Sequence, residues 1–106
     1  MNLQEASLQV NSRTFKLCHV ELENAILAFF FEDHARMGTV AIAMPGFGET
    51  AAGRSSILVG SKYMMSTRAL AEKLAGKTGK VTIISLYTML DETEALQNYS
   101  KLLDKV

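Results

Sequence analysis

The spacing of apolar side chains changes once along this chain, close to residue 60. Before this point apolar and polar residues alternate with a period of two, which is typical of strands that bury one face. After it, Thr67, Leu70 and Leu74 recur at intervals of three and four, which is typical of a helix with one buried stripe. A run of strands followed by helices predicts an α+β domain with the helices packed on a sheet.

The predicted elements follow the order β-β-β-β-β-α-β-α. The first five strands are expected at 8–10, 14–23, 25–31, 39–44 and 56–59. A helix at 61–75 and a strand at 80–88 come next, and Asp91 and Glu94 have the spacing of a capping box that starts a final helix. We expect a mostly antiparallel sheet with the helices on one side. At 106 residues the chain has the length of one domain, so 1–106 is taken as a single domain.

The strand at 14–23 carries apolar side chains on both parities. The face that we expect to be buried carries Cys18, Val20 and Leu22. This choice places His19 on the face that meets water. Phe15 and Leu17 have the opposite parity, so the prediction requires a β-bulge near Leu17, where the buried face would change.

The strand at 25–31 is apolar on both faces. A strand covered on both sides has this composition, and so does a strand with one face on the core and the other on a partner subunit. Three adjacent phenylalanines are hard to bury on both sides in so small a domain, so the second alternative weighs as much as the first. The residues assigned to dimerisation are Ile26, Leu27, Ala28, Phe29 and Phe30. Which of the two faces forms the interface stays open.

Charge and cysteine content restrict the classes of partner and the compartment. The chain has 11 basic and 11 acidic side chains, a poor basis for binding nucleic acid or an anionic membrane surface. The longest strongly apolar run, 25–31, is far shorter than the roughly 20 residues that span a bilayer. Cys18 is the single cysteine, and the first five residues lack the features of a signal peptide. We therefore expect a cytoplasmic protein that binds neither nucleic acid nor membranes.

No constellation typical of catalysis occurs in the sequence. His19 and His34 belong to different predicted elements, without a cysteine or carboxylate at metal-ligand spacing on the same face. The chain also lacks the G-x-S-x-G motif of a nucleophile elbow. We expect no metal, no cofactor and no enzymatic activity.

The glycine-rich segment 46–55 is the most distinctive loop. Gly46 and Gly48 begin like a dinucleotide-binding fingerprint, but alanine stands at position 51, where the third glycine is required. The plain interpretation is a connection between two strands. A nucleotide- or phosphate-binding enzyme that uses this loop is one functional alternative. As a partner-binding loop it would use Phe47, Glu49, Thr50 and Arg54.

From Arg36 onward the chain resembles the proteasome assembly chaperone 3 family, in its archaeal or eukaryotic homologues, and the first strands also fit that family, so the resemblance covers most of the chain. The resemblance rests on the layout of elements and on the motifs Arg36-Met37-Gly38-Thr39-Val40 and Ile57-Leu58-Val59-Gly60. It implies a non-enzymatic chaperone that pairs through its sheet, as a homodimer or with a paralogue, and helps proteasome α-type subunits assemble into rings. The strand at 25–31 would then serve dimerisation, and the loop at 46–55 would contact the α subunits.

The C-terminus differs from that of other proteasome chaperones, and one alternative function stays open. Chaperones that dock into α-ring pockets end in a hydrophobic–tyrosine–any tail, whereas this sequence ends in Asp104-Lys105-Val106, so docking by the C-terminus is not expected. The alternative is a dimeric scaffold of the roadblock or longin kind, which would bind a small GTPase or a trafficking partner.

Overall fold

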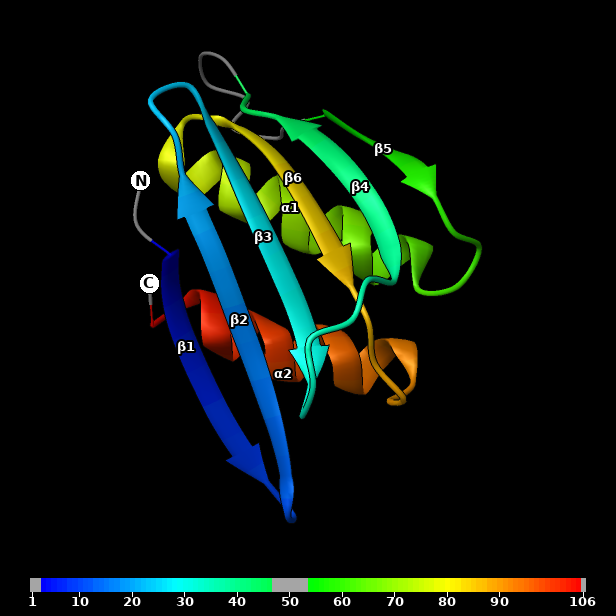
Figure 1. Ribbon diagram of the computed structural model, residues 1–106. Helices are drawn as coiled ribbons and strands as arrows, with labels where there is room; N and C mark the ends of the chain where they lie inside the picture. Colours follow the sequence, from blue (N-terminus) through cyan, green and yellow to red (C-terminus); the bar gives the residue numbers. More distant parts are fainter. Residues whose placement is uncertain (1–2, 47–53, 106) are drawn as a thin grey trace.

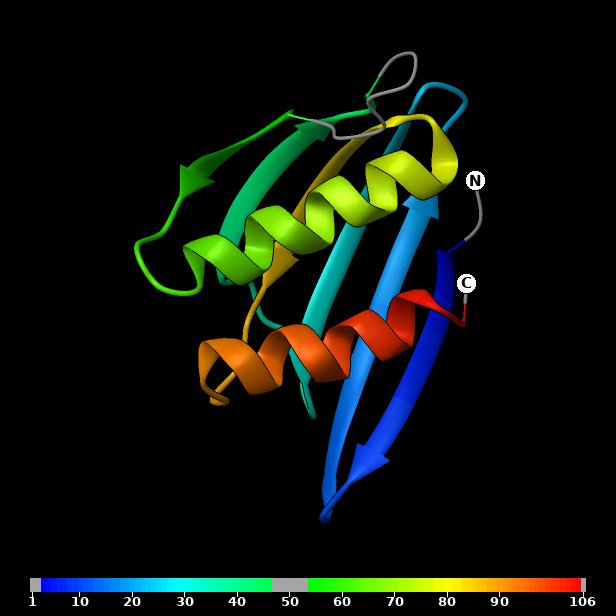
Figure 2. The ribbon, with the colours of Figure 1, turned by 180° about the vertical axis from the view of Figure 1, so that it is seen from behind.

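The computed structural model describes residues 3–46 and 54–105. In this part of the chain six strands form one sheet, and two helices cover one of its faces (Figures 1 and 2). The elements are β1 (Leu3–Val10), β2 (Arg13–Glu21), β3 (Ala25–Glu32), β4 (Thr39–Met44), β5 (Arg54–Val59), α1 (Met64–Thr78), β6 (Val81–Leu86) and α2 (Glu92–Leu103). Neither of these helices is long and apolar enough to cross a membrane.

The sheet is mixed, with the strand order β1-β2-β3-β6-β4-β5. β6 lies between β3 and β4, parallel to the first and antiparallel to the second. Because β5 and β6 are both antiparallel to β4, they run in the same direction, and α1 is the crossover that connects them. The predicted α+β domain with helices packed on a sheet is confirmed. The sheet was predicted to be mostly antiparallel, and it is mixed, because the helical crossover returns the chain to the middle of the sheet, where β6 pairs in parallel with β3.

The β1–β2 hairpin corrects the predicted faces of the second strand. Asn11 and Ser12 have φ angles of 50° and 64°, as in the two-residue turns that suit a hairpin. The pairing runs from Leu3 opposite Val20 to Val10 opposite Arg13 without a shift. The β-bulge predicted near Leu17 is therefore absent from β2.

The buried face of β2 carries Phe15, Leu17 and His19. Cys18 and Val20 lie on the other face and are only half-buried, so the prediction that they are buried was wrong, as was the prediction that His19 meets water. A regular hairpin keeps one parity throughout, and the large Phe15 and Leu17 side chains gain more from burial than cysteine and valine do.

The core lies between the sheet and the helices. α1 packs on β4 and β6, and α2 packs on β1 and β2. Thr39, Ala41 and Ala43 are buried on the helix-facing side of β4, where their small size allows α1 to approach closely. Tyr99 of α2 lies at the centre, with its ring edge-on to Phe15 at 5.6 Å and to Phe30 at 5.5 Å.

The helix ends follow local capping chemistry. The predicted cap of α2 is confirmed, because the Glu94 N–H donates to Asp91 Oδ1 at 2.8 Å. α1 continues past residue 75, where the sequence predicted its end, runs through Gly76 and stops before Gly79. Gly79 has a φ of 72° and donates its N–H to the Ala75 carbonyl at 2.8 Å, a left-handed cap that glycine adopts readily.

Candidate functional site

The sheet has one face without helices, which we call the open sheet face (Figure 1). Figure 2 shows both helices on the opposite side. Register places side chains from five neighbouring strands opposite one another in a single row. The row consists of Leu3, Val20, Leu27, Ile83 and Ile42. An apolar row that crosses β1, β2, β3, β6 and β4 is therefore the main feature of this face.

Part of this apolar surface meets solvent. Leu3 is 61% exposed, Leu27 36% and Met44, at the end of β4, 47%. A second row, next to the first, joins Phe29 to Ser85 and Val40. Contiguous exposed apolar patches are uncommon on monomeric proteins and usually mark an interaction site. The open sheet face is thus the candidate functional surface.

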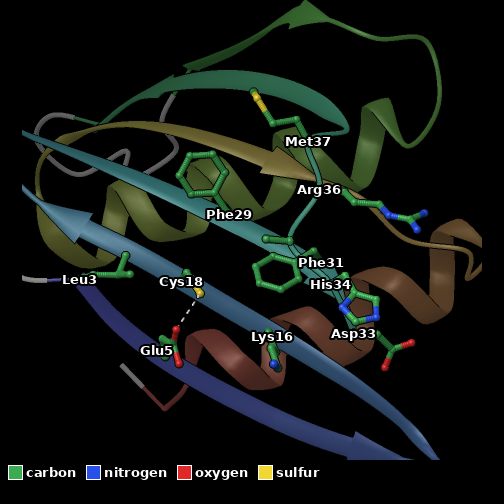
Figure 3. A pocket seen from close by; sticks show the side chains of 11 residues that line it. Leu3, Glu5, Lys16, Cys18, Phe29, Phe31, Asp33, His34, Arg36 and Met37 are labelled. Atoms are coloured by element: carbon green, nitrogen blue, oxygen red, sulfur yellow. Dashed lines mark hydrogen bonds between the residues drawn. The ribbon is translucent and has the colours of Figure 1, made fainter.

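A hollow of about 620 Å³ lies at one end of the open sheet face (Figure 3). Phe29 and Phe31 of β3 line it together with Met37 from the segment that follows. Its polar lining includes Glu5, Lys16, Asp33, His34 and Arg36. The hollow combines apolar side chains with charges of both signs, as at the edge of a protein interface.

The connection between β3 and β4 forms one side of this hollow. Its first residue, Asp33, is held by two hydrogen bonds to β2. Asp33 has a φ of 58°. Its N–H donates to the Thr14 carbonyl at 2.9 Å, and its Oδ1 accepts from the Thr14 N–H at 3.3 Å. These two bonds turn the chain at the end of β3 toward the open sheet face.

Cys18 in the hollow is a weak nucleophile. Burial raises the pKa of its thiol, and the neighbouring Glu5 carboxylate raises it further. The thiol donates to Glu5 Oε1 at 3.6 Å, shown as a dashed line in Figure 3. Because the thiolate is the reactive form, this environment does not activate Cys18 for covalent chemistry.

The two histidines lie in different environments, one buried and one exposed. His19 is 5% exposed on the helix-facing side of β2, which contradicts the prediction that it meets water. Among the described residues its Nδ1 has no hydrogen-bond partner. His34 is exposed at the hollow. Within residues 3–46 and 54–105, no group of three or more His, Cys, Asp or Glu side chains is placed to hold a metal ion.

The five residues assigned to dimerisation divide between the two faces of β3. Ile26, Ala28 and Phe30 are buried in the core, at 1%, 1% and 0% exposure, and cannot reach a partner. Leu27 and Phe29 lie on the open sheet face. The remaining apolar members of that face, from β1, β2, β4 and β6, were missed because sequence periodicity does not reveal which strands are neighbours.

The residues assigned to partner binding lie mostly beyond the described part of the chain. Phe47, Glu49 and Thr50 fall outside the described residues. Arg54 is exposed at the start of β5, opposite Met44, and so borders the open sheet face.

No protein-family model matches the chain, and no curated protein matches its sequence.

Proposed function

We propose that this chain is a non-enzymatic dimeric chaperone that pairs through its open sheet face and binds proteasome α-type subunits during assembly of the α-ring. The observation that carries the proposal is the apolar row across β1, β2, β3, β6 and β4 on a face without helices. Contact of such an apolar row with water is unfavourable, so a second surface that covers the row lowers the free energy.

The distribution of charge on the open sheet face supports pairing with a second copy. On the central strands β3, β6 and β4 this face presents apolar or neutral side chains, such as Leu27, Ser85 and Ile42. Its charged residues lie toward the flanks, with Glu5 and Lys16 on one side and Arg54 on the other. Two such faces can meet without bringing like charges together at their centre.

The size of the face also suits a dimer. A stable interface buries on the order of 800 Å² on each partner. Six strands spaced about 4.8 Å apart and roughly 20 Å long give a face of comparable area. Face-to-face packing would produce a two-sheet sandwich about 10 Å thick at its core, with the helices of both copies outside.

The client in this proposal comes from the family resemblance. The segments at 36–40 and 57–60 carry it, together with the helix, strand and helix that follow. We assign client contact to Phe47, Glu49, Thr50 and Arg54, in accordance with the position of the loop in that family. Contact through Arg54, at the border of the open sheet face, would leave the centre of that face free for pairing.

Binding to purified proteasome α-type subunits tests the proposal. We expect a complex that elutes together in size-exclusion chromatography, weakened by Arg54→Glu and unaffected by Lys101→Glu on the exposed side of α2. A folded dimer that binds no α subunit would refute the chaperone assignment and leave self-association standing. Recovery of a small GTPase or a trafficking protein from cell extract would favour the roadblock- or longin-like scaffold instead.

A further inference from the structure

A second recess lies at the end of the sheet where the central strands β3 and β6 terminate. It has a volume of about 360 Å³, and we call it the end cleft. Three segments form it: 37–39 entering β4, 60–63 between β5 and α1, and 86–89 after β6. Its lining includes Met37, Thr39, Lys62, Tyr63, Tyr87 and Met89. Of these, Met37 also lines the hollow on the open sheet face.

Two glycines allow the first two segments to approach the rest of the sheet closely. A Cβ on Gly38 would lie 2.0 Å from the Leu86 carbonyl oxygen. Gly60 has a φ of 104°, and a Cβ there would lie 2.7 Å from Thr39 Oγ1. The Thr39 hydroxyl donates to the Lys62 carbonyl, and the Gly38 N–H donates to Ser85 Oγ at 2.9 Å. The backbone of these walls is therefore held in place.

A buried carboxylate holds the third segment. Glu32 Oε2 accepts from the Met89 N–H and from the Thr88 hydroxyl, each at 2.5 Å. The Glu32 side chain is only 7% exposed, so these bonds replace the water that it gives up. Thr88 Oγ1 also accepts from the Leu90 N–H at 3.1 Å. Although its backbone is fixed in this way, the side chain of Met89 is 70% exposed.

The end cleft thus presents flexible apolar side chains on a fixed backbone. Met37, at its other side, is 67% exposed. Methionine has an unbranched, polarisable side chain that adapts its shape to an apolar partner. An arrangement of this kind suits a cleft that closes around an inserted side chain.

Two cations border the cleft. The Arg36 guanidinium lies 5.1 Å from the centre of the Tyr87 ring and donates to its hydroxyl at 2.7 Å. Lys62 Nζ lies 5.9 Å from the centre of the Tyr63 ring. In residues 3–46 and 54–105, no acidic side chain forms an ion pair with either cation.

Besides burial, the charges of Glu32, Asp91 and Glu92 raise the pKa of Tyr63, and all three acids are engaged in hydrogen bonds. Asp91 caps α2, and Glu92 Oε2 accepts from the Ser66 hydroxyl at 2.6 Å and from its N–H at 3.1 Å. The positive charges of Arg36 and Lys62 can therefore attract an acidic partner.

We propose that the end cleft binds an acidic peptide segment of a partner protein, with one apolar side chain of that segment inserted between Met37 and Met89. Arg36 and Lys62 attract the acidic residues on the two sides of the inserted side chain. This site adjoins the open sheet face, because Met37 lines both the end cleft and the hollow, and it goes beyond the proposed chaperone function.

Methyl NMR of the full chain with ¹³C-labelled methionine methyl groups tests this site. The probe is a synthetic peptide with one leucine between two pairs of glutamates. We expect the Met37 and Met89 signals to shift together and saturate, while the Met44 signal stays in place. Replacing the glutamates by lysines, or the leucine by alanine, should weaken binding about tenfold or more.

Variants separate the cleft from general surface effects. Met89→Glu and Lys62→Glu should each abolish the saturable shift at Met37, because they add negative charge at the cleft. Met65→Glu, at a side chain that is 79% exposed and outside the cleft lining, should bind like the unaltered chain. Unmoved Met37 and Met89 signals would overturn the proposal. Equal binding of the lysine peptide, or a shift confined to Met44, would do so as well.

Discussion

Phe29 and Phe30 are adjacent in β3, yet their removal should cause different defects. Phe30 is 0% exposed, and its ring meets Tyr99 edge-on at 5.5 Å. Replacing a buried phenylalanine by alanine costs about 3–5 kcal/mol, against a total stability of about 5–15 kcal/mol for a typical domain. Phe30→Ala should therefore lose a large part of the free energy of unfolding and leave a chain that is partly unfolded at room temperature or easily unfolded by urea.

Phe29 lies on the open sheet face, where a partner copy would cover it. Burying a phenylalanine contributes about 1.5–3 kcal/mol, and a symmetric dimer contains this contact once from each copy. Phe29→Ala should thus weaken pairing by about 3 kcal/mol, or roughly a hundredfold in dissociation constant. The folded monomer should keep most of its stability.

Urea unfolding followed by circular dichroism measures the first effect, and sedimentation velocity over a concentration series measures the second. Met65→Ala is the control, since Met65 is 79% exposed on α1, on the helix-covered side of the sheet. A Phe29→Ala dimer with an unchanged dissociation constant would refute pairing through this face. Wild-type stability of Phe30→Ala would refute the assignment of the two faces of β3.

Three further predictions concern single side chains. His19→Leu should leave the free energy of unfolding unchanged or raise it by about 1 kcal/mol, because it removes a buried nitrogen without a partner; a loss in urea unfolding would contradict this. Burial raises the pKa of Tyr99 above its ordinary value of 10.0, so the unfolded chain releases this proton first. Stability should be intact below pH 10 and fall as the pH rises beyond it. Tyr99→Phe should flatten that decline in pH-dependent unfolding. Burial and the Glu5 carboxylate raise the pKa of Cys18. Alkylation of Cys18 at pH 8 should therefore be slower in the folded chain than in the unfolded chain, and faster in the Glu5→Gln variant than in the unaltered folded chain. Mass spectrometry follows the reaction.

Local sequence patterns determined the elements and some of their faces. In β4 the small residues Thr39, Ala41 and Ala43 alternate with larger ones, and size alone indicates which side admits a helix. Asp91 and Glu94 likewise predict the start of α2, since capping depends on a few consecutive residues. The change of period near residue 60 predicts an α+β domain because each period matches the geometry of one kind of element.

The faces of β2 were decided by pairing. Its apolar residues occur on both parities, so alternation alone supports either choice. The regular hairpin with β1 sets a single parity for the whole strand, and burial of Phe15 and Leu17 selects it. His19 is buried as a consequence, because it shares their face.

The open sheet face exists only in the tertiary structure. Val20, Leu27, Ile83 and Ile42 come from four strands, and β6 separates two of those strands although it follows both in the chain. Periodicity indicates that each residue belongs to a strand with two faces, but it says nothing about which strands pair. The crossover through α1 brings β6 into the middle of the sheet and places both helices on one side. The sequence by itself therefore determined that apolar side chains exist on both faces, and the fold decided which of them stay uncovered.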